Sequence, residues 1–155
     1  MRLEADNMSI RFYFFSILIN GVLVGAGMGV PIFCILMGAP YGFLVVSKIF
    51  KKELKTDRHH HFYSGILKAS AVLALSTFVF MLIIWLPWVL RSFNPGFDYK
   101  NAGMPLLLYT LKASFWGWMT LMIVISPALQ FMTSVSAAVA AVWMFSKKQV
   151  SAGHD

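Results

Sequence analysis

Acidic side chains are missing from the long hydrophobic segments of this chain. Four apolar runs, residues 12–37, 62–90, 105–125 and 128–145, hold most of the 155 residues, and none contains an Asp or Glu. The six acids all lie outside these runs: Glu4, Asp6, Glu53, Asp57, Asp98 and Asp155. Carboxylates inside a membrane commonly mark paths for protons or cations, so their absence argues against the usual groups for such transport.

Metal-ligating and nucleophilic residues are also scarce. Cys34 is the single cysteine, which excludes an internal disulfide, a CxxC pair and a CxxCH haem attachment. His59, His60 and His61 are consecutive, so on a helix they point about 100° apart, and no Cys or carboxylate is spaced to complete a tetrahedral site. No Ser-His-Asp set, P-loop or Gly-rich nucleotide loop is present. We therefore predict no catalytic residue and no metal site, and these residues favour a non-enzymatic protein without deciding the question.

The composition is that of a membrane protein. The chain is 59% hydrophobic and only 12% charged, whereas a soluble domain carries roughly 25% charged residues. A chain of this size cannot bury so much apolar surface in its own core, and the runs exceed the ~10-residue strands of a membrane barrel. We predict an all-α integral membrane protein, with residues 1–155 forming one domain and the four runs forming a four-helix transmembrane bundle.

Basic residues give the chain a net charge of +7 and gather beside the hydrophobic ends. Such a distribution suits anionic lipid headgroups, and no nucleic-acid partner is expected. We predict a basic amphipathic segment at the membrane interface, residues 41–61, on the cytoplasmic side. Its headgroup contacts are expected from five residues: Lys48, Lys51, Lys52, Lys55 and Arg58. With four spans, both termini then lie outside.

A five-span alternative divides residues 12–50 into two spans and places the N-terminus inside. Each half has about 18 residues, which is just enough to cross. The regular glycine spacing in the first run favours one helix instead. Gly38-Ala39-Pro40 is expected to end this helix, and Ser126-Pro127 to begin the fourth span.

Small residues predict helix packing in the first and fourth runs. Gly21, Gly25 and Gly29 recur every four residues, so they share one helix face, where another backbone can approach closely. Ala137 and Ala141 share a face in the fourth run. The partner of each face is either this chain or another.

Few polar groups lie within the runs. Lys68 and Lys112 are the only charges in the main spans, and each lies about two turns from the polar end of its run. A lysine in this position can extend its ammonium to the headgroups, or it can form an anion or polar-solute site inside the bundle. Asn20 is expected to bond to a neighbouring helix.

Three stretches give the chain a resemblance to the large subunit of cytochrome bd quinol oxidases. Residues 19–23, running on to 27–29, are similar to the first helix of that family. Gly103-Met104-Pro105-Leu106 resembles the Gly-Ala-Pro-Leu that opens its third helix, and residues 133–137 before Val142-Trp143 resemble its fourth helix. The resemblance covers most of the chain and implies the N-terminal four-helix half of that subunit.

The chain departs from this family at the functional positions. The haem-ligating His of the family falls near Asn20, and the third-helix glutamates fall near Tyr109 and Gly117. The resemblance therefore implies a haem-free scaffold attached to an electron-transfer complex.

The leading functional hypothesis is a non-catalytic polytopic subunit or accessory protein of a larger membrane complex, with a respiratory complex as one candidate. A first alternative is a small oligomeric transporter or channel for an anion or polar solute, lined by Lys68, Lys112, Ser70, Ser114 and Thr110. A second is a redox subunit that contacts a quinone or lipid through residues 109–118. We expect the lipid bilayer and other membrane subunits, or further copies of the chain, as partners. The expected location is a prokaryotic inner membrane. No cofactor is predicted, although the redox alternative would involve haem or quinone.

Overall fold

The computed structural model describes residues 10–26, 31–53 and 62–152, and the regular elements in these ranges are all helices. Helix α1 covers Ile10–Ala26, α2 covers Pro31–Glu53 and α3 covers Phe62–Ser92. After the connection 93–110, α4 (Leu111–Thr120) passes through a π-helical turn, η2 (Leu121–Ile125), into α5 (Ser126–Ala152). The prediction of an all-helical protein is confirmed.

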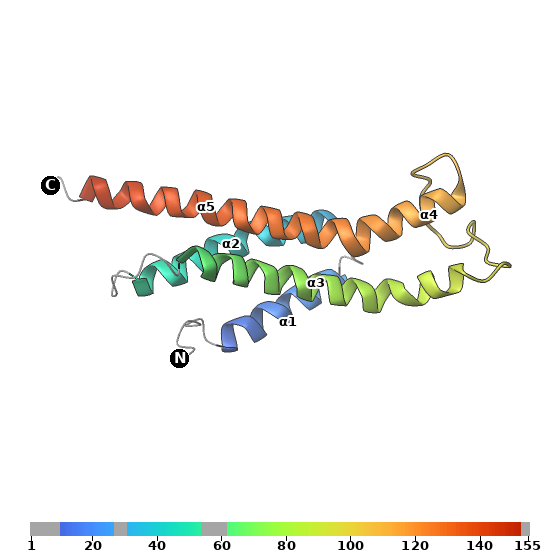
Figure 1. Ribbon diagram of the computed structural model, residues 1–155, viewed down its shortest axis with the longest axis horizontal. Coiled ribbons are helices and arrows are strands. Elements are labelled where there is room, and N and C mark those ends of the chain that lie inside the picture. The colour runs from blue at the N-terminus through green and yellow to red at the C-terminus, as the bar shows by residue number, and fades with distance from the viewer. Residues whose placement is uncertain (1–9, 27–30, 54–61, 153–155) are drawn as a thin grey trace.

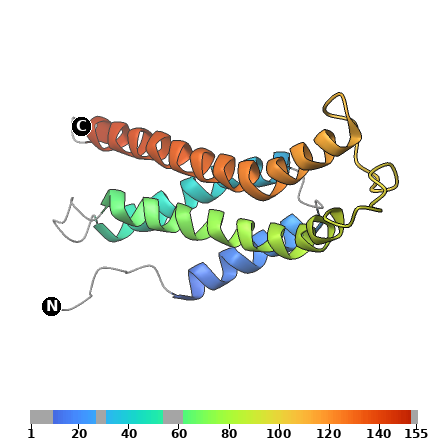
Figure 2. The ribbon, with the colours of Figure 1, turned by 45° about the vertical axis from the view of Figure 1, so that its right-hand side comes forward.

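The helices pack side by side and alternate in direction (Figures 1 and 2). α1 and α3 run the same way, while α2 and the rod formed by α4, η2 and α5 run the opposite way. The start of α1, the end of α2, the start of α3 and the end of α5 therefore lie at one end of the molecule, which we call the basic end. The connection 93–110 lies at the other end, which we call the loop end.

Among the residues that the structure describes, three helical segments are long and apolar enough to cross a membrane: Ile32–Ile49, Tyr63–Ser92 and Leu111–Lys147. Helix α1 is apolar but shorter, with 17 residues. Large hydrophobic side chains lie exposed along all of these helices, including Val22 on α1, Leu36 on α2, Leu75 on α3 and Val139 on α5. Length and composition are thus consistent with a membrane protein.

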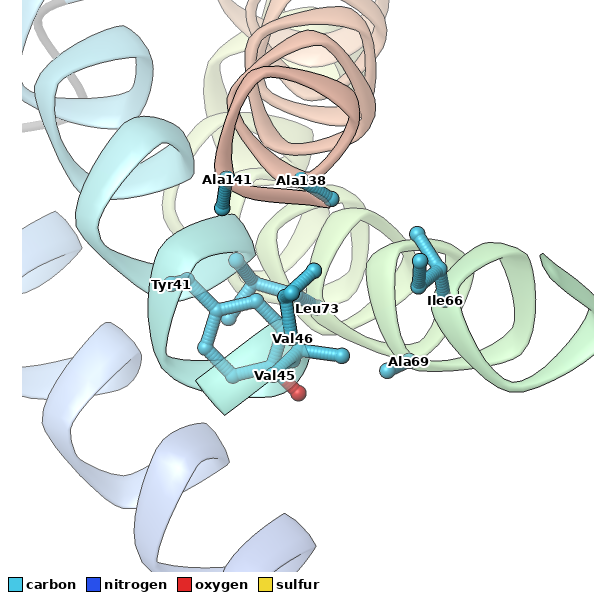
Figure 3. Packing of buried hydrophobic residues seen from close by; sticks show 8 residues of the cluster. All are labelled: Tyr41, Val45, Val46, Ile66, Ala69, Leu73, Ala138 and Ala141. Carbon is cyan, nitrogen blue, oxygen red and sulfur yellow. The ribbon is translucent and has the colours of Figure 1, made fainter. Parts of the chain in front are cut away.

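The main core lies where α2, α3 and α5 meet (Figure 3). Helix α2 contributes Tyr41, Val45 and Val46, and α3 and α5 contribute the other buried members: Ile66, Ala69, Leu73, Ala138 and Ala141. Phe12 and Tyr13 of α1 pack against this cluster from the side. A smaller cluster of Val24, Cys34 and Met81 joins α1, α2 and α3.

The prediction of a single helix over residues 12–37 is wrong. The chain forms two helices of opposite direction, α1 ending at Ala26 and α2 beginning at Pro31. Proline suits the first position of a helix, because its missing N–H would have no partner there in any case. As a result, the start of α1 and the end of α5 lie at the end where α2 meets α3, not opposite to it as the four-run prediction required.

The predicted helix end at residues 38–40, which was to separate the basic segment 41–61 from the first span, is also wrong. Residues 41–53 continue α2 through Pro40, and Tyr41, Val45 and Val46 of this segment are buried against α3 and α5. Phe43 and Leu44 of the same segment are exposed. Residues 54–61 lie outside the described ranges.

The predicted boundary between the third and fourth spans is wrong as well. Residues 105–110 are not helical, and the chain is continuously helical from Leu111 to Ala152. In η2 the backbone N–H of Ser126 donates to the carbonyl of Leu121, five residues earlier, and the Ser126 hydroxyl donates to the same oxygen at 2.8 Å. This wider turn accommodates Pro127, which would otherwise crowd the carbonyl four residues before it.

Candidate functional site

A cycle of side-chain hydrogen bonds joins α1, α3 and α5 in the interior. The Asn20 amide nitrogen donates to the Thr77 hydroxyl at 2.7 Å, and the Thr77 hydroxyl donates to the Gln130 side-chain oxygen. The Gln130 amide nitrogen closes the cycle by donating to the Asn20 side-chain oxygen at 3.0 Å. All three side chains are at most 1% exposed. We call these three residues the polar cycle.

The polar cycle uses most of its own hydrogen-bonding capacity. Each member both donates and accepts within it, and the second proton of the Asn20 amide goes to Ser76 Oγ at 3.0 Å. None of the three ionises near neutral pH, so the arrangement offers no acid–base chemistry. Its physical effect is to hold three helices at one register. Asn20 was expected to bond to a neighbouring helix, and this is confirmed.

A second polar contact supports α3 against α5. The Ser70 and Ser134 hydroxyl oxygens lie 2.8 Å apart, and both side chains are buried. Serine allows close approach as well as a hydrogen bond, so this pair contributes to both packing and register.

Helices α2 and α5 approach most closely at Gly38 and Gly42. A Cβ atom at Gly38 would lie 2.6 Å from the Gln130 carbonyl oxygen, and one at Gly42 would lie 2.9 Å from the Ser134 carbonyl carbon. Because these neighbours are backbone atoms, they cannot move aside as a flexible side chain can. The four-residue spacing of the two glycines is a packing signal. It was missed because Gly38-Ala39-Pro40 was interpreted as a helix end.

The packing residues predicted from the sequence have different surroundings. Gly21 lies under Phe80 of α3, since a Cβ there would be 2.7 Å from the ring. Gly25 is exposed, and a Cβ there would meet nothing within 4 Å. Ala141 is buried in the main core, whereas Ala137 is half-buried. Gly29 lies outside the described residues.

The predicted headgroup contacts lie towards the basic end. Lys48 is exposed, with its ammonium 4.0 Å from the centre of the Phe12 ring. Lys51 and Lys52 belong to the last residues of α2, while Lys55 and Arg58 lie outside the described ranges.

The candidate anion site is not assembled within the chain. Lys68 is exposed near the start of α3, and Lys112 is exposed at the start of α4, at the opposite end of the molecule. Ser70 is bonded to Ser134, Ser114 bonds to the backbone of residues 107 and 108, and Thr110 caps α4 by accepting from the Ala113 N–H. The five residues proposed to line a pore are thus dispersed.

The aromatic segment 109–118 helps to close the loop end. Phe115 is buried and makes edge contacts with Phe97, Tyr99 and Trp116. Tyr109, by contrast, is 92% exposed. Phe115 and the three rings that it contacts thus pack together between the α3–α4 connection and α4.

Comparison of the chain with protein-family models, with curated proteins and with solved structures found no match. The resemblance to cytochrome bd oxidases is therefore carried by the quoted sequence stretches alone. In the described ranges, no group of three or more His, Cys, Asp or Glu side chains converges on a point where a metal could bind. The amide of Asn20, the residue near which the resemblance places the haem ligand of that family, is engaged in the polar cycle.

The polar cycle predicts a specific stability effect. Asn20→Ala leaves Gln130 and Thr77 with lost partners in a buried site, which costs about 1–3 kcal/mol for an unsatisfied group. We expect a lower unfolding midpoint for purified protein in mild detergent. Ser47→Ala is the matched control, because the Ser47 hydroxyl donates to the Leu44 carbonyl of its own helix at 2.9 Å. Equal midpoints for the two variants would contradict the role given to the cycle.

The α2–α5 contact predicts opposite effects for the same substitution at two glycines. Gly42→Ala places a methyl group against the Ser134 backbone and should destabilise the fold by about 1–3 kcal/mol, as overpacking does. Gly25→Ala adds a methyl group in open space and should be neutral or stabilising, since alanine favours a helix over glycine. Titration with a denaturing detergent measures both. A destabilised Gly25→Ala beside an unaffected Gly42→Ala would refute the assigned contact.

Proposed function

We propose that this chain is a polytopic membrane protein that serves as a non-catalytic subunit of a larger membrane complex. The observation that carries the proposal is an outer surface with many exposed large hydrophobic side chains around buried polar side chains that bond from helix to helix. Such a surface suits lipid or the helices of partner proteins. The polar cycle joins helices and contains no ionisable group.

Three cations at one level of the helices indicate how deeply the molecule sits in the proposed membrane. Helices α1 and α3 are parallel and Asn20 contacts Thr77, so Arg11, nine residues before Asn20, lies level with Lys68, nine residues before Thr77. Lys48 lies beside Phe12 and so joins this level. We call these three residues the cationic collar, and their positive charges suit contact with lipid phosphates.

Arg91 and nearby tryptophans mark the level that we assign to the opposite membrane interface. Arg91 lies 5.8 Å from the Trp88 ring, and Phe93 lies 5.8 Å from Trp116 on α4. From Lys68 to Arg91 the helix rises about 34 Å at 1.5 Å per residue, close to the hydrocarbon thickness of about 30 Å. Tryptophan and arginine at this level suit the aromatic belt at a membrane interface.

The distribution of Lys and Arg favours an orientation in which the basic end faces the cytoplasm. Arg91, Lys100 and Lys112 are the basic residues in and beside the α3–α4 connection. The other ten of the 13 Lys and Arg residues belong to sequence near or beyond the opposite helix ends. Cytoplasmic segments carry the excess of Lys and Arg, so both termini are assigned to the cytoplasm. Lys147, on the unfavoured side in the four-run prediction, is then on the favoured side.

Partner binding is assigned to the exposed face of α1. Among the described residues, nothing lies within 4 Å of a Cβ placed at Gly25, so a helix of another subunit can approach it closely. Helix α1 is also shorter than α2, α3 and α5, and it contacts mainly α3. Much of its surface is therefore uncovered. This proposal retains the expected role of Gly25 while making its partner another chain.

The topology predicts which cysteines are accessible from outside intact cells. On a Cys34→Ala background, Lys100→Cys should react with a membrane-impermeant maleimide in whole cells. Lys147→Cys should react only after the cells are permeabilised. The reverse pattern would refute the orientation, and reaction of both in whole cells would refute the assignment of two sides.

The subunit role predicts that Gly25→Leu separates assembly from folding. A leucine there should remove most of the co-purifying partner, measured by mass spectrometry and native-gel migration, without lowering the unfolding midpoint of the isolated chain. Ala71→Leu, at another exposed small residue on α3, is the matched control and should keep the partner. Unchanged migration of Gly25→Leu would contradict the proposal.

A further inference from the structure

Residues 105–109 form a non-helical apolar segment on the outside of the molecule, which we call the strap. Its sequence is Pro-Leu-Leu-Leu-Tyr, and it begins after Gly103, whose φ of 69° is readily adopted by glycine. Leu106 is 63% exposed and Tyr109 is 92% exposed. Figures 1 and 2 show this part of the chain projecting beside α4, on the side that faces away from α3.

The strap is held against α4 by a defined set of hydrogen bonds. The buried Ser114 hydroxyl oxygen accepts from the N–H groups of Leu107 and Leu108 at 3.0 and 2.8 Å, and its proton goes to the Leu108 carbonyl at 2.9 Å. The Trp118 indole N–H donates to the Pro105 carbonyl at 2.9 Å. The leucines are thus presented outward by a fixed backbone.

These bonds place the strap at one depth. Its two anchors, Ser114 and Trp118, lie on either side of Trp116, which contacts Phe93 just beyond Arg91 of α3. The strap is therefore level with the tryptophan and arginine boundary described above. Lys112 is exposed on the adjoining turn of α4.

Two physical constraints restrict what can cover the strap. Non-helical backbone exposed to lipid is not tolerated in the hydrocarbon region, because unpaired peptide groups lose hydrogen bonds there. Three consecutive exposed leucines, in turn, are unfavourable in water. The interfacial zone satisfies both constraints, since water and headgroups can bond to the backbone while acyl chains cover the side chains. The nearby Lys112 and Arg91 suit phosphate groups.

We propose that the strap is an interfacial anchor that inserts its leucines into the lipid leaflet at the loop end, at the level of the glycerol groups and the upper acyl chains. This inference rests on the proposed membrane location. The ligand class is phospholipid, held by apolar contact with the strap and by charge contact with the flanking cations. The anchor fixes the depth of α4 and keeps the α3–α4 connection at the surface.

Depth-dependent quenching tests the anchor. On the Cys34→Ala background, single cysteines at Leu106, Lys100 and Leu75 are labelled with an environment-sensitive fluorophore and reconstituted into vesicles of phosphatidylcholine and phosphatidylglycerol. The vesicles contain lipid with a quencher either near the headgroup or deep in the acyl chain, and iodide is added as an aqueous quencher. Tyr109→Cys provides a second strap position if the Leu106 variant does not fold.

The expected result is that the strap label is quenched several-fold more by the shallow lipid than by the deep lipid. The Lys100 label, on the polar turn of the same connection, should respond mainly to iodide. The Leu75 label, on an exposed position midway along α3, should respond mainly to the deep lipid.

The controls separate the two proposals. If the Leu75 label responds to iodide and not to lipid, the membrane location itself fails. If Leu75 responds to deep lipid but the strap label responds only to iodide, the anchor fails while the membrane location survives. A strap label shielded from both lipid and iodide would show a protein partner over the strap, and one quenched best by deep lipid would place it in the hydrocarbon. Either result overturns the interfacial anchor.

Discussion

Helices surrounded by lipid gain little from apolar contact alone, because lipid tails are as apolar as leucine side chains. Directional hydrogen bonds and close backbone contacts must then determine which helices pair and at what register. The polar cycle of Asn20, Thr77 and Gln130 meets this need for α1, α3 and α5. The level of the cationic collar depends on it, because sliding α1 by one turn against α3 would break the cycle and move Arg11 away from Lys68.

Helix α2 is held by a different physical means. It makes its closest contact with α5 through Gly38 and Gly42, where the absence of side chains brings the two backbones together. This contact explains why Pro40 does not end the helix. The hydrogen bond that proline cannot make is lost, but packing of Tyr41, Val45 and Val46 against α3 and α5 holds the residues that follow in place. Local propensity is overruled by tertiary contact here, as it commonly is.

The two ends of the molecule differ in the same way that the proposed membrane surfaces differ. At the basic end, lysines lie on regular helices and beside aromatic rings, as Lys48 does over Phe12 and Lys147 over Trp143. At the loop end, the chain leaves helical geometry, packs several aromatic rings on one another and presents the strap. In the proposed role, this arrangement would hold the chain at one depth in a bilayer and leave α1 open to a partner.

The hydrophobic runs and the scarcity of acids were sufficient to predict the helical class, the apolar surface and the extent of α3, because these features follow from composition along the chain. Asn20 could be recognised as an interhelical donor, since a carboxamide in an apolar run requires a partner. Its partners Thr77 and Gln130 could not be named, because they lie 57 and 110 residues away. Only the tertiary structure decided that Pro31 begins a helix of opposite direction, that Pro40 and Pro127 continue helices, and that residues 105–110 leave the helix. The local signals allowed two outcomes: packing against α3 and α5 selected the continuation at Pro40, the wider turn closed by Ser126 selected it at Pro127, and hydrogen bonding to Ser114 fixed the non-helical segment before α4.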